Sequence, residues 1–364
     1  MKWSWKIARV AGIDVYIHAT FLILLIWLGM VFWNDSGSIL AVVNGLAFIL
    51  ALFGCVLLHE YGHALTARHY GIQTRNIVLL PIGGVAALEG MPKDPRQEIR
   101  VALAGPMVNF LIAVLLWLML APGTSDPPLS LVQGSFLERL MIVNIVLAVF
   151  NLLPAFPMDG GRVLRALLAM WLNRTQATQI AANVGQLMAL GFGFLGLLYN
   201  PFLLFIALFV WIGAVAEASA ERMKLALYGA TAGQAMLQEY HTLSTQNTLQ
   251  EAVNLTLKTL QKDFPIENNG KLVGVLSQVR LLEELEKHNE STPIERVQLE
   301  SISTVDIHTP LEDLLTRMQG SSTVLVAVQE RGQVVGIVDL DNIMELIKIH
   351  NAVEQHQGSA ETRR

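Results

Sequence analysis

The chain has 364 residues, of which 53% are hydrophobic and 15% are charged, and its mean hydropathy is +0.47. Soluble domains carry roughly 25% charged residues, so this composition argues against a wholly soluble protein and indicates membrane-spanning segments. The net charge is −5, and no Lys/Arg cluster is interleaved with aromatic residues, which excludes a nucleic-acid partner. The single cysteine, Cys55, excludes an intramolecular disulfide.

Six apolar runs approach the length that crosses a bilayer, which is roughly 20 residues of helix for about 30 Å of hydrocarbon. They are Ala19–Trp33, Ile39–Thr66, Val101–Ala121, Leu140–Leu153, Ile180–Tyr199 and Phe202–Ala218. The fourth run is short, and its Asn144 and Asn151 indicate that it faces protein or a cavity. The first run lacks a signal-peptide cleavage site, so we expect it to be retained. The sequence predicts a polytopic α-helical membrane protein with about six spans.

The distribution of cations predicts the orientation of these spans, because Lys and Arg are retained on the cytoplasmic side. Segments on one side contain many cations, grouped within 2–9, 68–100, 162–174 and 222–224. The intervening segments near Asn34–Ser38, Pro122–Ser135 and Asn200–Pro201 contain none. We therefore expect a multi-pass protein of the cell membrane with both termini in the cytoplasm.

An extended segment follows the second apolar run. Residues Gly71–Leu88 are rich in β-branched side chains and are interrupted by Pro81, Gly83 and Gly84. Extended chain at membrane depth must pair its backbone or border a cavity. We expect a small membrane-associated β-sheet there, with Val10–Tyr16 as a further strand.

The C-terminal part contains an internal repeat with an offset of 62 residues. Residues 248–251 correspond to 310–313, and 269–276 correspond to 331–338. Each copy reads as helix, strand, glycine turn, strand and helix. We expect a transmembrane domain over 1–220, a linker over 221–232, a soluble α/β domain over 233–350 and a disordered polar tail over 351–364.

The most specific motif is the sequence His59-Glu60-Tyr61-Gly62-His63 within the second apolar run. Residues four apart lie on one face of a helix, so both imidazoles can bind one Zn²⁺, with Glu60 beside them as a general base. The alternative is that the histidines only satisfy the cytoplasmic end of the helix. Gly62 weakens a helix, but a small residue there allows another backbone to approach.

A catalytic zinc needs a third protein ligand. Asp159 is the best candidate, since it follows Pro154 and Pro157, which end the fourth apolar run and leave irregular chain around the carboxylate. The alternative is that Asp159 and Gly160 form an ordinary surface turn. Weaker candidates for the third ligand are His18, His69 and Glu89.

Together these motifs resemble the site-2 protease family of intramembrane metalloproteases. The resemblance covers about 1–220 and includes HEYGH, the GGVA after it, Gly105-Pro106-Met107-Val108-Asn109 and NLLPAFPMDGG. It implies a zinc metalloendopeptidase that cuts transmembrane protein substrates, with one zinc per chain held by His59, His63 and Asp159 and with Glu60 activating water.

The resemblance also implies a substrate-binding surface. Asn109 would face the site and hold the substrate backbone or the developing oxyanion; the alternative is an interhelical hydrogen bond. Gly83 and Gly84 would belong to a strand that receives an unwound substrate segment at a sheet edge. Asn151 is a further candidate for the cavity lining, without an assigned role.

The repeat resembles a pair of cystathionine β-synthase (CBS) motifs, a regulatory module that often binds adenosine nucleotides and often forms dimers. The nucleotide signature G-x-x-[ST]-x-x-D is altered in both copies. Arg280 replaces the Asp of the first copy, and Asp339 replaces the hydroxyl residue of the second. Nucleotide binding is therefore in doubt, and a structural role or a homodimer through the pair is at least as well supported.

Two other classes of protein remain open. A divalent cation transporter or channel gated by its CBS pair also combines apolar spans with this module. Transport does not require a glutamate next to the first histidine, and no inverted repeat of spans is present. A catalytically inactive scaffold is the other alternative, which the intact His59, Glu60, His63 and Asp159 argue against.

Overall fold

A computed structural model describes residues 3–81, 83–88, 90–92, 94–120, 134–259, 261–320 and 324–349 of the chain. The chain divides into two compact units, Met1–Ser219 and Ala220–Arg364, each with its own core. The predicted tail, 351–364, lies outside the described residues.

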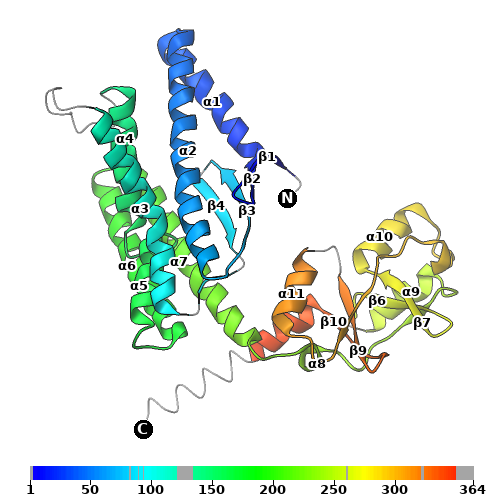
Figure 1. Ribbon diagram of the computed structural model, residues 1–364. Helices are drawn as coiled ribbons and strands as arrows, with labels where there is room; N and C mark the ends of the chain where they lie inside the picture. Colours follow the sequence, from blue (N-terminus) through cyan, green and yellow to red (C-terminus); the bar gives the residue numbers. More distant parts are fainter. Residues whose placement is uncertain are drawn as a thin grey trace. The chain divides into compact units, whose positions relative to one another are not determined.

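Helices dominate the first unit (Figure 1). They are α1 Ala19–Ser36, α2 Ile39–His69, α3 Pro95–Met119, α4 Phe136–Asn151, α5 Asp159–Leu168, α6 Arg174–Leu198 and α7 Phe202–Leu227. Among the described residues, five helices are long and apolar enough to cross a membrane, namely α1, α2, α3, α6 and α7. The fourth predicted span is the helix α4, but at 16 residues it is shorter than these five.

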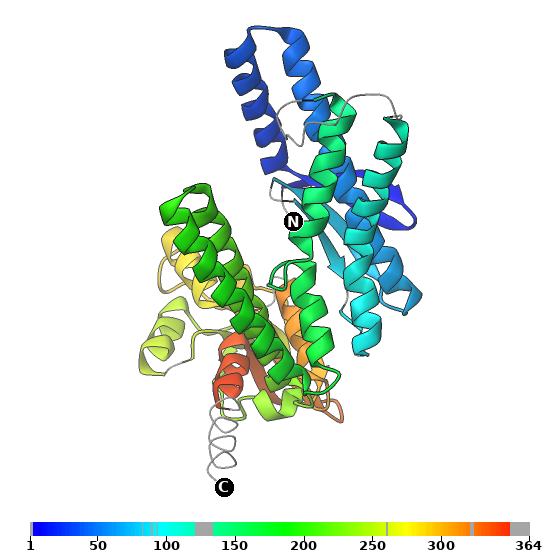
Figure 2. The ribbon, with the colours of Figure 1, turned by 90° about the vertical axis from the view of Figure 1, so that its left-hand side faces the viewer.

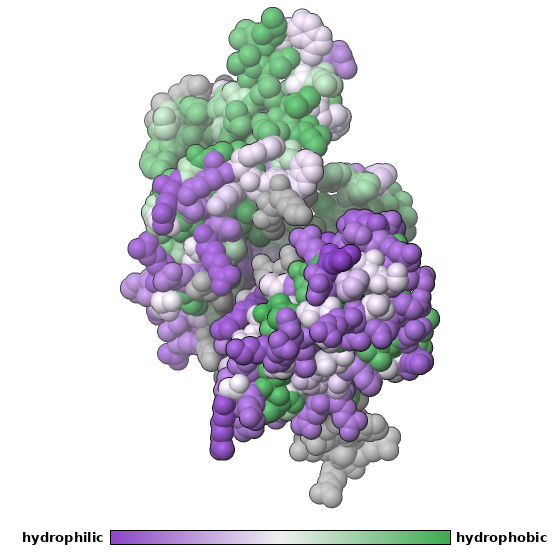
Figure 3. Space-filling model, turned by 90° about the vertical axis from the view of Figure 1, so that its right-hand side faces the viewer, coloured by the Kyte–Doolittle hydropathy of each residue, from purple (hydrophilic) through white to green (hydrophobic). Residues whose placement is uncertain are grey.

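Apolar side chains cover the outside of these helices. On α1 alone, Ile23, Ile26, Trp27 and Met30 are each more than half exposed. Figure 3 shows the resulting hydrophobic surface around the end of the unit formed by α1 and α2. A soluble domain does not expose apolar patches of this size, so this surface is suited to lipid.

A four-stranded sheet lies against α2 (Figure 1). Its strands are β1 Ser4–Val10, β2 Ile13–His18, β3 Thr74–Leu80 and β4 Gly83–Leu88, in that spatial order. The predicted sheet is therefore present, and β4 is one of its edges. The predicted strand over Val10–Tyr16 is wrong in its bounds, because a turn with positive φ at Ala11 and Gly12 separates β1 from β2.

Small residues allow α3 to pack closely beside α2 and α5. A Cβ on Gly62 would lie 2.8 Å from the carbonyl oxygen of Ala104 on α3, so glycine is required for this approach, as the sequence predicted.

Figure 2 shows α3 alongside both α4 and α5, which follow one another along its length. Pro154 and Pro157 lie in the short segment between α4 and α5, which positions the first residue of α5 next to α2.

The second unit contains the repeat as two copies of one fold. The first copy has β5 Leu243–Ser244, α9 Leu249–Lys258, β6 Phe264–Asn268, β7 Lys271–Leu276 and α10 Gln278–Lys287; the second has β8 Ser303–Asp306, α11 Leu311–Gly320, β9 Leu325–Glu330, β10 Gln333–Asp339 and a helical segment over 340–349. Short elements α8 Ala232–Ala235 and η1 Ile294–Arg296 precede and follow the first copy. Each copy forms a three-stranded sheet, and the elements correspond at the predicted offset.

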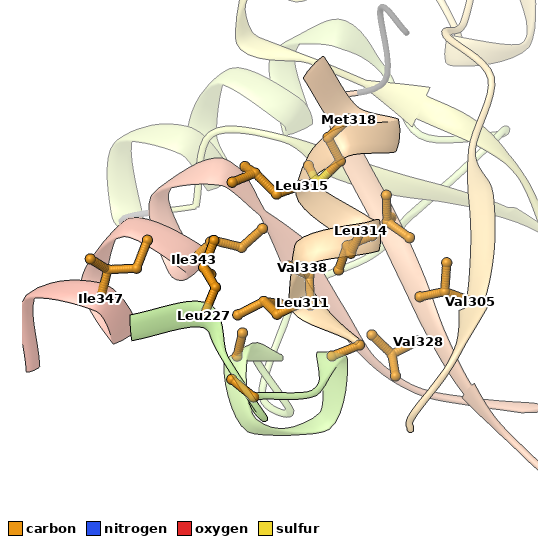
Figure 4. Close-up of a cluster of buried hydrophobic side chains, with 14 of the residues drawn as sticks. Leu227, Val305, Leu311, Leu314, Leu315, Met318, Val328, Val338, Ile343 and Ile347 are labelled. Carbon is orange, nitrogen blue, oxygen red and sulfur yellow. The ribbon is translucent and has the colours of Figure 1, made fainter. Parts of the chain in front are cut away.

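The cores of the two copies are apolar. In the second copy, Leu311, Leu314, Val328 and Val338 are fully buried and point toward one another (Figure 4). Leu227, the last residue of α7, belongs to the same cluster. The first part of the segment expected to be a linker is therefore helical and contributes to the core of the second unit.

Candidate metal centre and substrate cleft

Helix α2 presents two histidines to the interior of the first unit. His59 and His63 are one turn apart and both buried, with exposed fractions of 6% and 3%. Their Nε2 atoms are 3.1 Å apart. This is the convergence that the four-residue spacing predicted.

Asp159, the first residue of α5, supplies a carboxylate at the same point. Its Oδ2 lies 3.1 Å from His63 Nε2 and 3.2 Å from His59 Nε2. The chain between α4 and α5 is tightly folded, since a Cβ on Gly160 would lie 2.3 Å from the carbonyl oxygen of Leu152. Glycine after Asp159 therefore lets the helix begin where its first carboxylate reaches the histidines.

The three atoms that converge are suited to a metal ion. His63 Nδ1 is 2.7 Å from the carbonyl oxygen of Val101. A carbonyl only accepts hydrogen bonds, so Nδ1 donates, and Nε2 of the neutral ring directs a lone pair at Asp159 Oδ2. Acceptors this close need a cation or a proton between them. In a zinc tetrahedron with bonds of about 2.0–2.1 Å the ligands are about 3.3 Å apart, so the residues present fit zinc.

Gly105 on α3 closes the centre from another side. A Cβ at this position would lie 2.2 Å from His63 Nε2 and 2.6 Å from His59 Nε2. Any side chain would therefore enter the space where the three ligand atoms meet. This gives a physical reason for glycine in the segment Gly105–Asn109 that the family resemblance identified.

An ion-pair network fixes α5, and so Asp159, against its neighbours. Arg165 is 2% exposed, and its guanidinium lies 2.6 Å from Glu98 of α3 and also pairs with Glu217 of α7. Glu98 is completely buried and is approached by Arg174 at 3.2 Å. Burying such charges is costly unless they are paired, and these pairs join α3, α5, α6 and α7.

Beside the metal centre lies a cavity of about 350 Å³. Its walls include Glu60, the first residues of β4, and Asn151. A Cβ on Gly84 would lie 2.7 Å from Glu60 Cγ, so glycine lets the edge strand approach the glutamate. The structure therefore brings Glu60, Gly83, Gly84 and Asn151 to the wall of one cavity.

Asn109 lines an adjoining part of the same cavity, together with Val56, Leu147 and Phe150. It is 1% exposed, and its Oδ1 has no hydrogen-bond partner among the described residues. Among the described residues this oxygen therefore makes no interhelical hydrogen bond. Asn151 differs, because its Nδ2 donates to the carbonyl oxygen of Leu147 at 3.0 Å.

The weaker candidates for the third ligand lie elsewhere. His18 caps α1, where its Nδ1 accepts a hydrogen bond from the backbone of Thr20. His69 is at the far end of α2 with its ring against Tyr70. Glu89 lies outside the described residues. Within the described chain, His59, His63 and Asp159 are the group whose ligand atoms converge.

Sequence reasoning missed two residues near this centre. Arg162 lines the cavity and Arg165 anchors α5, but both were counted only as cations that orient the spans. For Arg162, the spacing of three from Asp159 on a helix was a usable signal. The partners of Arg165 are 67 and 52 residues away in the sequence, and no local pattern indicates them.

Comparisons with known proteins agree with this geometry. Peptidase family M50 matches residues 47–192, and the CBS domain matches residues 294–349. A zinc metalloprotease of Methanocaldococcus jannaschii is 31% identical over 357 residues, which cover 98% of this chain and 99% of the relative. Rip3 of Mycobacterium tuberculosis is 28% identical over 388 residues, covering 97% of this chain and 95% of the relative.

A solved site-2 protease from Methanocaldococcus jannaschii is also similar, with 36% identity and a TM-score of 0.44. It covers 59% of this chain and 95% of the solved chain.

The apolar helices, the buried His/His/Asp centre and the adjoining glutamate define a multi-pass membrane zinc metalloprotease. The chain belongs to peptidase family M50, the site-2 protease family, and carries a C-terminal CBS module.

Proposed function

We propose that this protein hydrolyses peptide bonds in or near the transmembrane segments of other membrane proteins, as in regulated intramembrane proteolysis. The observation that carries the proposal is the convergence of His59, His63 and Asp159 inside a membrane helix bundle, beside Glu60 and a cavity bordered by an edge strand. We assign the three converging residues as zinc ligands and Glu60 as the general base.

Zinc held by His59, His63 and Asp159 would supply a Lewis acid for the scissile carbonyl and would lower the pKa of water at the site. Glu60 accepts a proton from the attacking water and passes it to the leaving amine. The hydrogen bond from His63 Nδ1 to Val101 holds the ring in the tautomer that leaves Nε2 free. The ion pairs of Arg165 hold α5 so that Asp159 keeps its place.

The edge strand β4 gives the substrate a place to bind. A helical substrate has its amides already hydrogen-bonded, so it must unwind before attack. An unwound segment can pair with the free edge of β4 at Gly83 and Gly84, which lies directly beside Glu60. Asn109, with its unpartnered Oδ1, is suited to hold the substrate backbone through its amide, and Asn151 completes the wall.

The second unit is proposed to regulate the protease. Asp339 occupies the hydroxyl position of the nucleotide signature, and Asp341 lies two residues later. These carboxylates disfavour a polyphosphate, so a dimerising role is at least as well supported as nucleotide sensing. We keep both termini in the cytoplasm as part of the proposal.

Cleavage of a transmembrane reporter in proteoliposomes tests the proposal. The substitution Glu60→Gln should lower the rate of reporter cleavage by about 10²–10⁴-fold, because the general base is lost. The zinc content should stay at the wild-type level. The control is His69→Ala, which changes a histidine of the same helix outside the centre and should retain activity. Full activity of Glu60→Gln removes the mechanism.

The cation transporter remains the second candidate, because a buried His/His/Asp group can also bind a passing ion. Uptake of Zn²⁺ or Mg²⁺ into proteoliposomes distinguishes the two functions. Uptake that persists in Glu60→Gln, in protein that cleaves no reporter, would favour transport.

A further inference from the structure

Arg162 is a cation of the cavity wall that the proposed hydrolysis does not use. It lies one helical turn after Asp159, and its Nη1 is 3.7 Å from Asp159 Oδ1, with 31% of the side chain exposed. That separation exceeds a hydrogen bond. A guanidinium carries five N–H donors in a rigid fork, and within the described chain none of them has a hydrogen-bond acceptor. The donors are therefore available to a ligand in the cavity.

The cavity has two overlapping parts that share Glu60 and differ in the other side chains that line them. The part that contains Arg162 extends along Val85, Ala86 and Leu88 of β4. The part that contains Asn109 adds the apolar side chains Val56, Leu147, Phe150 and Met158 to residues that both parts share, among them His59, Glu60 and Asn151. A segment paired with β4 would therefore meet a cation toward one end and an apolar pocket toward the other.

Contacts along α3 show which part of the cavity lies nearer the helix ends of α2 and α3 that carry several cations. Glu98, near the start of α3, pairs with Arg165. One turn later Val101 accepts a hydrogen bond from His63. Gly105, a further turn along, packs against both histidines. Asn109, one turn further, lines the apolar end. Arg162 lies between Asp159 and Arg165 along α5, so it is on the side of the metal centre toward Glu98. The apolar end is deeper in the bundle.

We propose that Arg162 determines specificity by binding an acidic side chain of the substrate, on the surface-proximal side of the scissile bond. This inference rests on the proposed function and names its substrate class: a transmembrane segment with an apolar stretch followed by a Glu or Asp near its cytoplasmic boundary. A carboxylate matches the guanidinium fork in a bidentate pair, and partial burial strengthens such a pair.

Charge complementarity also explains why this residue type suits the position. Carboxylates are costly in lipid, so an acidic residue at the end of a span needs a partner once that end is drawn into the cavity. Glu60 and Asp159 are already in the cavity wall and would repel a further carboxylate. Arg162 is the cation among the residues that line this part of the cavity, and it offsets that repulsion.

The test uses transmembrane reporters that differ at one position. A Glu, Gln or Lys is moved through successive positions on the surface-proximal side of the mapped cleavage site, and kcat and KM are measured in proteoliposomes. For wild type we expect kcat/KM to be about tenfold higher with Glu than with Gln at one position, the size of a charge-assisted contact. The difference should appear mainly in KM.

Three variants separate recognition from a structural role, with zinc content measured in each. Arg162→Gln should reduce the Glu/Gln ratio to about one, and Arg162→Lys, which keeps the charge but not the fork, to about threefold. Arg100→Gln, which removes a cation bound to the Tyr70 hydroxyl away from the cavity, should leave the ratio unchanged.

Three results would overturn the inference: equal cleavage of all reporters by wild type, retention of the ratio in Arg162→Gln, or an equal loss on every reporter in both Arg162 variants. If wild type cleaves no reporter at all, the proposed function fails instead.

Discussion

The two units of this protein differ in what they bury. In the described residues of the first unit, the buried polar and charged side chains are His59, His63, Glu98, Asn109, Asn144, Asp159, Arg165 and Thr178, whereas in the second they are Ser277 and Glu284. Burial of polar groups is costly unless they are paired. Most of these groups in the first unit line the metal centre and its cavity or form the ion pair that holds α5, so much of its buried polarity serves chemistry. The second unit has apolar cores that serve stability.

The largest effect is expected from a side chain that fills the metal centre of the first unit. Gly105→Ala should lower zinc content and reporter cleavage by more than about 100-fold, because the added Cβ would lie 2.2 Å from His63 Nε2. The measurements are zinc per chain by metal analysis and the cleavage rate. Gly54→Ala on α2 is the matched control, since a Cβ there meets nothing within 4 Å; wild-type zinc content in Gly105→Ala would contradict the geometry.

Removing a charge should affect the first unit far more than the second. Within the described residues, Arg165→Met leaves the buried Glu98 with only the contact from Arg174, and breaking a buried pair costs about 3–5 kcal/mol. We expect the Tm of the purified protein to fall by about 10 °C. Lys262→Ala removes an exposed pair with Asp341 in the second unit and should leave Tm unchanged. Equal Tm shifts in the two variants would contradict this difference between the two units.

A smaller effect is expected where the edge strand meets the general base. Gly84→Ala places a Cβ 2.7 Å from Glu60 Cγ, which displaces the carboxylate from its working position. The kcat for the reporter should fall by about tenfold while zinc content is retained. Unchanged kcat would show that β4 does not constrain Glu60.

The smallest effect concerns the pH dependence of the second unit. Burial, followed by repulsion from Asp341, raises the pKa of Asp339, and burial also raises the pKa of Asp263, which Asp339 repels. Each carboxyl thus binds a proton more readily when folded, so stability falls as pH rises from the unfolded pKa through the folded pKa. Asp339→Asn should raise the Tm of the second unit slightly at pH 7, and the gain should vanish at pH values below the unfolded pKa. A gain that grows on acidification would contradict this sign.

Much of the site could be predicted from the sequence, because its main elements are local. The spacing of His59 and His63 fixes their common face on any helix. Pro154 and Pro157 mark irregular chain before Asp159, and the glycines around residue 83 mark the strand. The repeat was equally readable, since Asn269-Gly270 and Arg331-Gly332 form corresponding turns in the two copies, where a glycine turn was predicted.

The parts of the site that the sequence did not predict depend on contacts between distant segments of the chain. Gly105 was recognised only as part of a family motif, and its approach to both histidines follows from the packing of α3 on α2. The pairs of Arg165 with Glu98 and Glu217 join three helices, and periodicity within any one helix does not encode them. The turn at Ala11 was missed because a non-glycine residue with positive φ is uncommon.

The most direct test of the central claim is zinc stoichiometry in Asp159→Asn compared with wild type, after purification and removal of loosely bound metal. The account predicts about one zinc per chain in wild type, and less than about a tenth of that in the variant, whose amide is a poor ligand. Full zinc in Asp159→Asn would contradict the assignment of the third ligand and the mechanism built on it.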